Sequence, residues 1–233
     1  MKTQARKIAA AAAVLCGLAA GPAFANLVLV SPQPIGGTGL GAVSTVLTLQ
    51  SPANSSVESG SVARAGGVDV LSGNTTALNS TYSFGELSIT NASQIGIVFN
   101  ASEPAPANDV TLTGLQLSIY SATGGAALFS SGNVVCGATV NNCNLTNTFS
   151  GTGNSGFLFT LDTTQAAAAN SFITGTNRIG LSATATSATG GNETFFVTRL
   201  AGTVTPPIPE PETYALMLAG LGLMAFMARR RMR

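Results

Sequence analysis

The sequence predicts an all-β fold: a β-sandwich or jelly-roll-like single domain with one short helix. Apolar and polar residues alternate with a period of two along several short runs. Clusters of Gly, Asn, Ser and Pro separate these runs at intervals of roughly 10–20 residues, as in sandwiches and jelly rolls. Only 8% of the 233 residues are charged. The outward positions of the strands are therefore expected to carry Ser and Thr, which suit a strand without charge.

The strands follow from this alternation. The clearest example is segment 115–120, where Leu115, Leu117 and Ile119 alternate with polar residues and share one face of a sheet. Segments 47–50 and 157–161 show the same pattern, and 95–99 and 195–200 are further short apolar runs. The alternation changes phase between residues 84 and 89, which predicts a strand with a bulge there.

One segment departs from the β pattern. Asp162-Thr163-Thr164-Gln165 has the form of a capping box, and four alanines follow it. This predicts a short helix over about 163–170, packed against one end of a sheet. Segments 50–81 and 136–156 are rich in Ser, Asn and Gly, and we expect loops there.

Charge is distributed unevenly along the chain. Seven of the ten basic residues lie in the terminal segments, whereas residues 26–205 hold three arginines and seven acids, which gives three minus seven, or −4. Without clustered basic residues in the body, we expect no nucleic-acid partner. The chain has no histidine, which excludes a Ser-His-Asp triad, a His-ligated zinc site and a His-ligated haem.

Residues 1–25 have the pattern of a secretory signal peptide. Lys2, Arg6 and Lys7 precede an apolar stretch at 8–20, and Ala23-Phe24-Ala25 fits the cleavage rule of small residues. Signal peptidase is thus expected to cleave after Ala25 and leave Asn26 as the mature start. A membrane anchor is disfavoured because the apolar run is shorter than the roughly 20 residues that span a bilayer. Lipidation at Cys16 is disfavoured because Leu15 stands where a small residue is required.

The C-terminal segment 205–233 has three parts. A proline-dense linker at 205–212 is followed by an apolar run at 214–228 and then by the basic end Arg229-Arg230-Arg231-Met232-Arg233. The linker is expected to be extended because proline lacks the backbone donor. The apolar run is expected to form a membrane helix, with the arginines kept in the cytoplasm by the positive-inside bias.

This order of elements resembles the PEP-CTERM sorting signal of Gram-negative bacteria. The residues that carry the resemblance are Pro209, Glu210 and Pro211, the apolar run, and Arg229, Arg230 and Arg231. The resemblance implies processing by exosortase, a membrane transpeptidase, after transient anchoring in the inner membrane with the C-terminus cytoplasmic. It also implies association with the cell surface, exopolysaccharide or biofilm matrix. The alternative is an ordinary tail anchor that is never cleaved.

These two ends leave residues 26–204 as a single β-rich extracytoplasmic domain. This domain contains Cys136 and Cys143, and an even pair in an oxidising compartment predicts a structural disulfide. We expect no metal and no cofactor. Calcium binding stays an open alternative, with Asp109 and Glu103, or Glu193 with nearby loop carbonyls, as candidates. Apart from that alternative, all seven acids of residues 26–205 are expected to be surface charges, or caps and turns.

The resulting functional prediction is a non-enzymatic, exported surface or extracellular-matrix protein. Its few charges and many hydroxyl and amide groups suit a hydrated surface that hydrogen-bonds to exopolysaccharide, the expected partner. One alternative is a carbohydrate-binding module, for which Tyr82, Tyr120 and Phe129 are the candidate contact residues. A third is a glycoside hydrolase, which requires two carboxylates across a cleft, but no acid stands in a local motif. We therefore predict no catalytic residue.

Overall fold

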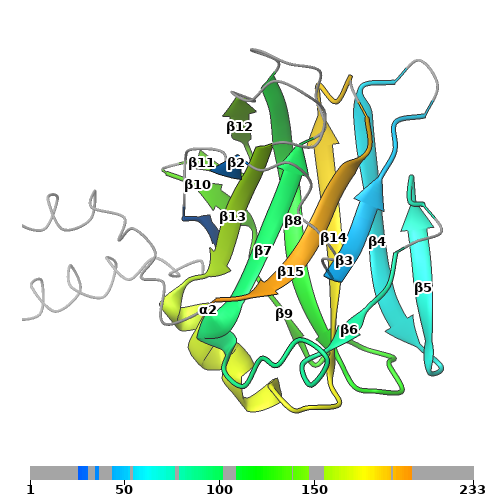
Figure 1. The fold of residues 1–233 in the computed structure, drawn as a ribbon, viewed down its shortest axis with the longest axis vertical. Coiled ribbons are helices and arrows are strands. Elements are labelled where there is room, and N and C mark those ends of the chain that lie inside the picture. The colour runs from blue at the N-terminus through cyan, green and yellow to red at the C-terminus, as the bar shows by residue number, and fades with distance from the viewer. Residues whose placement is uncertain are drawn as a thin grey trace, which may run out of the picture.

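The computed structural model describes residues 26–30, 35–36, 44–52, 55–76, 79–101, 109–137, 139–146, 155–189 and 191–200. They form two β-sheets that face each other across a common apolar core (Figure 1). The predicted all-β class is confirmed. The predicted signal peptide, the 205–212 linker and the C-terminal apolar run lie outside the described residues.

The first sheet has eight strands. Its main path, from edge to edge, is β11 (Thr139–Val140), β10 (Val134–Cys136), β1 (Leu27–Leu29), β13 (Ser155–Leu161), β7 (Ile95–Ala101), β15 (Glu193–Arg199) and β3 (Ser44–Leu49). The short β2 (Ile35–Gly36) also pairs with β13. The central strands β13, β7 and β15 are antiparallel neighbours, whereas β1 and β10 run parallel.

The second sheet has seven strands. Its main path is β12 (Cys143–Thr146), β8 (Asp109–Tyr120), β14 (Arg178–Thr186), β4 (Val57–Ala65) and β5 (Val68–Gly73). Two short strands flank this path: β6 (Tyr82–Ser83) pairs with β14, and β9 (Phe129–Ser130) pairs with β8. All of these pairings are antiparallel, so connections can be short where strands adjoin in sequence.

The core lies between the inner faces of the two sheets. Leu115, Leu117 and Ile119 of β8 are buried, while Gln116 is exposed and its polar neighbours are half-buried. The phase predicted for this strand is confirmed. From the opposite sheet the ring of Phe99 stacks on those of Phe157 and Phe195, at centroid distances of 6.3 and 4.7 Å. Offset aromatic pairs of this kind add to the stabilisation from their buried area.

The predicted helix is also present. Helix α2 spans Thr163–Ala169, and a 3₁₀ turn, η2 (Asn170–Phe172), continues it. The side chain of the cap residue Asp162 accepts a hydrogen bond of 2.8 Å from the N–H of Gln165. The N–H of Asp162 donates to the carbonyl of Asn26 at 3.0 Å. The cap therefore connects the helix to the chain just before β1. A second 3₁₀ turn, η1 (Ala92–Gln94), precedes β7.

Three local predictions are wrong. One is the loop expected at 136–156, where the strands β11 and β12 form. The segment expected to be a bulged strand at 84–89 is a turn, because the N–H of Ile89 returns to the carbonyl of Phe84 at 2.9 Å and Ser88 has a positive φ of 54°. Within the expected loop 50–81, β4 and β5 form a hairpin around Gly66 and Gly67, whose φ values are 57° and 78°. This pair of positive φ values suits a two-residue hairpin turn.

Candidate functional site

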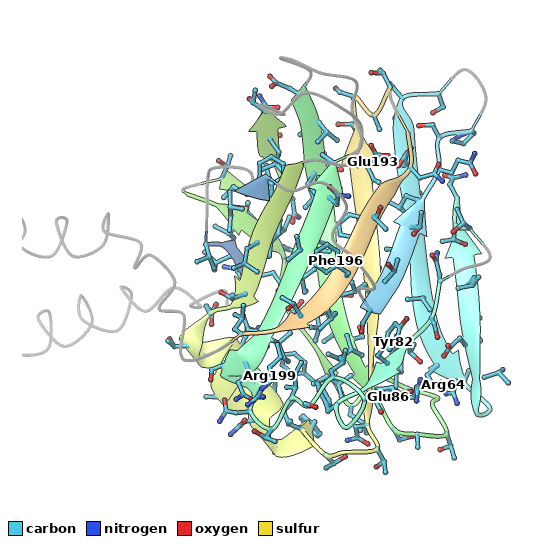
Figure 2. The ribbon with its side chains drawn as sticks, viewed as in Figure 1. Arg64, Tyr82, Glu86, Glu193, Phe196 and Arg199 are labelled. Atoms are coloured by element: carbon cyan, nitrogen blue, oxygen red, sulfur yellow. A yellow bond between two sulfur atoms is a disulfide. The ribbon has the colours of Figure 1, made fainter. Side chains whose placement is uncertain are left out.

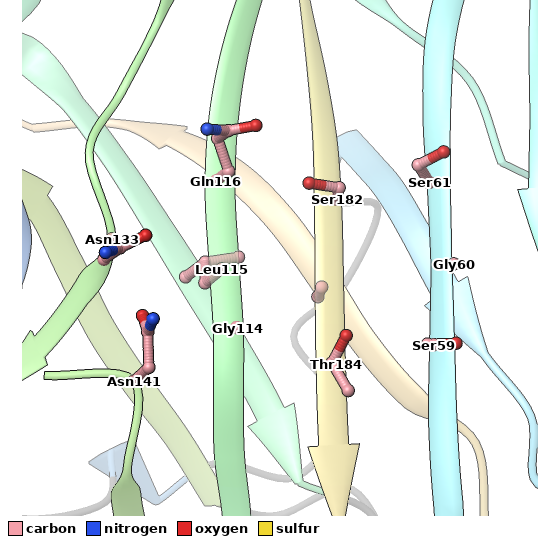
Figure 3. Close-up of a pocket in the computed structure, with 11 residues that line it drawn as sticks. Ser59, Gly60, Ser61, Gly114, Leu115, Gln116, Asn133, Asn141, Ser182 and Thr184 are labelled. Atoms are coloured by element: carbon pink, nitrogen blue, oxygen red, sulfur yellow. The ribbon is translucent and has the colours of Figure 1, made fainter.

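A groove of about 410 Å³ crosses the outer face of the seven-stranded sheet. It passes over β8, β14 and β4, and Figure 3 shows its residues from outside the sheet. The polar side chains that line it are small or carry amides: Ser59, Ser61, Gln116, Asn133, Asn141, Ser182 and Thr184. None of the described residues that line it is charged.

The alternation of the strands places these groups on one face. Ser182 and Thr184 of β14 point outward, whereas Ala183 between them points into the core. Ser182 lies opposite both Gln116 of β8 and Ser61 of β4 in the sheet register. Three adjacent strands therefore contribute one row of hydroxyl and amide groups across the sheet.

Gly114 opens the floor of the groove. It lies opposite Thr184, and the register of β8 against β14 shifts beside this pair. An added Cβ at Gly114 would lie 3.6 Å from the Cβ of Thr184, which is ordinary contact. A larger side chain at this position would therefore occupy the groove. The groove is thus shaped by a missing side chain and a local β-bulge.

The rim comes from the segments around β10 and β12. Asn133 and Asn141 are both exposed, and Gln116 donates a hydrogen bond of 3.1 Å from Nε2 to the carbonyl of Ser131. That bond holds the Gln116 side chain beside the rim. The groove offers hydroxyl groups, amide donors and amide carbonyls, a set that can hydrogen-bond to a neutral polar chain.

The two cysteines adjoin this region. Their sulfur atoms lie 2.00 Å apart, and their Cα atoms are separated by 5.4 Å. Cys136 ends β10 of the eight-stranded sheet, whereas Cys143 begins β12 of the other sheet. The pair therefore links the two sheets along one side of the sandwich, in addition to closing the short loop between the two cysteines.

The three aromatic candidates do not line the groove. Tyr82 and Phe129 are partly buried and pack against the core. Tyr120 is half-buried, and an added Cβ at Gly180 would lie only 2.9 Å from its Cε2 atom. Tyr120 thus packs over this glycine. The three rings belong to three different strands, β6, β8 and β9. The prediction that they form a surface for contact with carbohydrate gains no support from these positions.

Most described acids have structural partners. Asp69 forms an ion pair of 2.9 Å with Arg64 and also accepts hydrogen bonds from Ser80 and Thr81. Burial acts to raise the pKa of Asp69, but these hydrogen bonds outweigh it and lower the pKa below its ordinary value. The backbone and hydroxyl of Ser83 lower the pKa of the Glu86 carboxyl, with a smaller contribution from Arg178. Figure 2 shows Arg64, Tyr82 and Glu86 near one end of the sandwich.

Two acids contradict the expected surface role. Glu58 and Glu193 are both fully buried. Glu58 lies in β4 of the seven-stranded sheet, and Glu193 lies in β15 of the eight-stranded sheet. Oε1 of Glu58 accepts a hydrogen bond of 2.7 Å from Ser51, and its Oε2 has no hydrogen-bond partner among the described residues. Asp109, the other calcium candidate, accepts a hydrogen bond of 3.2 Å from Asn144. Glu103 lies outside the described residues.

The described residues contain no group of three or more His, Cys, Asp or Glu side chains arranged to hold a metal ion. A second hollow, of about 510 Å³, lies beside the 84–88 turn. Arg199 is the charged residue among those that line it. Phe84, Ile89 and Ile173 supply much of its wall. It is less polar than the groove on the seven-stranded sheet, which therefore remains the candidate site.

Sequence reasoning did not identify the groove residues. The sequence did contain a pattern typical of such a polar face. Ser stands at alternate positions of 59–61, and Ser and Thr stand at alternate positions of 182–184. Sequence reasoning assigned such residues to the outer faces of strands in general and did not bring these particular ones together. That three strands place them side by side depends on strand order, which the alternation does not specify.

The comparison with known families concerns the C-terminal part of the chain. Residues 207–231 match the family model of the PEP-CTERM protein-sorting motif. The chain carries a PEP-CTERM motif. The matched range includes Pro209, Glu210 and Pro211 and extends to Arg231, so the resemblance noted from the sequence is confirmed. No curated protein and no solved structure matches the chain.

The PEP-CTERM motif implies an exported protein that is sorted through the membrane and processed by exosortase. The motif lies outside the described residues, as do Ala23 and Ala25 of the predicted signal cleavage site. Among the described residues no helix has the length and apolar character needed to cross a membrane.

Proposed function

We propose that this exported protein is a non-enzymatic component of the cell surface or extracellular matrix, held there by contacts with exopolysaccharide. The observation that supports the proposal best is the uncharged groove on the seven-stranded sheet. Its hydroxyl and amide groups match the hydrogen-bonding groups of a neutral sugar chain. Because the groove is open and crosses three strands, it suits a polymer rather than a small enclosed ligand.

The arrangement favours many weak hydrogen bonds over one tight subsite. None of Tyr82, Tyr120 and Phe129 lines the groove, so a flat stacking surface does not contribute there. The groove also has no lining carboxylate among the described residues, whereas glycoside hydrolysis needs two. These observations support a matrix component over a specific carbohydrate-binding module or a hydrolase.

The proposed processing is tested first. Cells with and without exosortase are fractionated, and mass spectrometry determines the C-terminus of the protein in each fraction. We expect cleavage at or near Pro209-Glu210-Pro211 in normal cells, and an uncleaved membrane-bound form without exosortase. A chain that still ends at Arg233 in normal cells would contradict the processing.

The groove contact is tested separately, on protein purified after export. Affinity electrophoresis in gels that contain the exopolysaccharide of the producing cells measures retardation of the protein. We expect the Gln116→Ala/Asn141→Ala variant to be retarded less than the unaltered protein, because both exposed side chains line the groove. The matched control is Thr163→Ala/Thr164→Ala, at exposed positions of α2. Equal retardation of all three proteins would contradict polysaccharide binding at this groove.

A further inference from the structure

Strand β5 forms an open edge of the seven-stranded sheet. The path of this sheet ends at β5, which has β4 as its neighbour on one side (Figure 1). The other terminal strands of the described sheets differ. Residues 74–76 cover the outer edge of β3, through bonds such as that from the N–H of Gln50 to the carbonyl of Asn74 at 2.9 Å. Strand β11 has two residues, and β12 is held by the disulfide at Cys143.

The register shows which backbone groups of β5 face outward. The N–H of Asn74 donates to the carbonyl of Ser59 at 2.7 Å, just beyond the pair Gly60–Gly73. Backbone groups alternate between the two sides of a strand in an antiparallel ladder. Val68, Val70 and Ser72 therefore direct their N–H and C=O groups toward β4. Asp69 and Leu71 direct theirs away from it, where no described residue accepts or donates.

The side chains of β5 do not protect this edge. Val68, Val70 and Leu71 are exposed by 61%, 44% and 38%. The strand contains neither lysine nor proline, the residues that commonly block pairing at an edge. Its one charged side chain, Asp69, is bonded to Arg64 within the same hairpin and to Ser80 and Thr81. The edge therefore presents unpaired backbone groups and apolar side chains without net charge.

We propose that β5 pairs in antiparallel fashion with β5 of a second copy of this chain, so that two seven-stranded sheets join edge to edge. A two-fold arrangement with Val70 opposite Val70 of the second copy pairs the outward N–H and C=O groups of Asp69 with those of Leu71. The same arrangement brings the exposed valines of the two strands together. The neutral Asp69–Arg64 pair introduces no net like-charge repulsion at the contact.

The chemistry of the β5 edge favours β5 of a second copy as the partner strand. A partner must supply a strand whose N–H and C=O groups are both free along one side. The chain's own 205–212 linker contains prolines at 206, 207, 209 and 211, and each lacks the donor that such pairing requires. A second β5 has the required donors and acceptors at matching positions. This self-association goes beyond the proposed function and does not depend on sugar binding.

A cysteine crosslink tests the register. In the proposed arrangement Val70 forms a non-hydrogen-bonded pair with its symmetry mate, at a Cα separation of about 4.5 Å, which a disulfide can bridge. Mild oxidation of the exported Val70→Cys protein should therefore give a covalent dimer on a non-reducing gel. The matched control is Ser72→Cys, which would lie opposite Val68 of the partner. Absence of the Val70→Cys dimer, or equal crosslinking of the control, would overturn the proposed pairing.

Light scattering after size-exclusion chromatography tests the association without crosslinking. We expect the unaltered protein to dimerise reversibly as its concentration rises. Val70→Lys should raise the dimer dissociation constant by at least about tenfold, because it places two charges opposite each other at the edge. The control Val140→Lys changes a valine of similar exposure, 51%, in β11, and should leave the constant unchanged. A monomer at every concentration, or equal effects of the two lysines, would overturn the proposal.

Discussion

Asp162 offers the sharpest test of how this domain is held together. One carboxylate oxygen accepts the 2.8 Å hydrogen bond from the N–H of Gln165 in the first turn of α2. The other accepts a hydrogen bond from the N–H of Asn26, directly before β1. A single half-buried side chain thus joins the start of the helix to the first strand, across 136 positions of sequence.

The expected cost of removing this side chain follows from those two bonds. Loss of an N-cap destabilises by about 1 kcal/mol, and loss of a hydrogen bond to a charged acceptor by about 1.5 kcal/mol or slightly more. Asp162→Ala should therefore lower the free energy of unfolding by about 2–3 kcal/mol. For a domain of this size the midpoint of thermal unfolding should fall by roughly 4–12 °C.

Circular dichroism during heating measures this on the exported protein. Asp162→Asn should lose less stability than Asp162→Ala, because asparagine is also a good N-cap. The matched control is Asp109→Asn, since the carboxylate of Asp109 is exposed and accepts a bond of 3.2 Å from Asn144; this change should stay within about 0.5 kcal/mol. If Asp162→Ala unfolds at the same temperature as the unaltered protein, the reasoning is refuted.

Three further predictions concern stability. Replacing both Cys136 and Cys143 by serine should lower the free energy of unfolding by about 2.5 kcal/mol, from the chain entropy of a loop closed at a sequence separation of 7. Urea unfolding of this variant and of the unaltered oxidised protein measures the difference, and equal midpoints would contradict a stabilising bridge. Gly180→Ala should lower the free energy of unfolding by about 2 kcal/mol, because the new Cβ would clash with the carbonyl oxygen of Val62. An unchanged urea midpoint would count against this close contact. The lowered pKa of Asp69 predicts that its contribution is present above the ordinary value of 3.8 and is lost as the pH falls through the lower folded-state pKa. Urea midpoints between about pH 5 and pH 2 should therefore fall less steeply in Asp69→Asn than in the unaltered protein, and parallel curves would refute the assignment.

Signal processing should alter the contact at Asp162. If signal peptidase cleaves before Asn26, the backbone donor becomes an α-ammonium group, and its bond to Asp162 becomes an ion pair. Asp162→Asn should then destabilise the protein that begins at Asn26 more than a form with extra N-terminal residues. N-terminal sequencing and thermal unfolding at low and high salt measure this difference. Equal losses in both forms would contradict the ion pair.

Local chemistry determined the parts that sequence analysis predicted correctly. The alternation at 115–120 predicted the buried and exposed sides of β8, because successive side chains of a strand point to opposite faces. The cap at Asp162 predicted α2, because capping uses residues within one turn. The PEP-CTERM motif was found in the same way, since its order of proline, apolar and basic residues is contiguous in the chain. None of these features required knowledge of strand pairing.

Tertiary structure alone decided the features that depend on which strands are neighbours. The hairpin of β4 and β5 was missed because its apolar residues do not alternate regularly with polar ones, so the period-two pattern that indicated the other strands is absent there. The strand order places β8, β14 and β4 side by side, so that their polar residues form the groove, and it leaves β5 at an edge. It also places Cys136 and Cys143 in different sheets, so that their disulfide links the two sheets. The same chain segment can face core or solvent according to the partner it meets, because register and strand order are non-local properties. Glu58, a charged residue within a sequence of polar appearance, is buried for that reason.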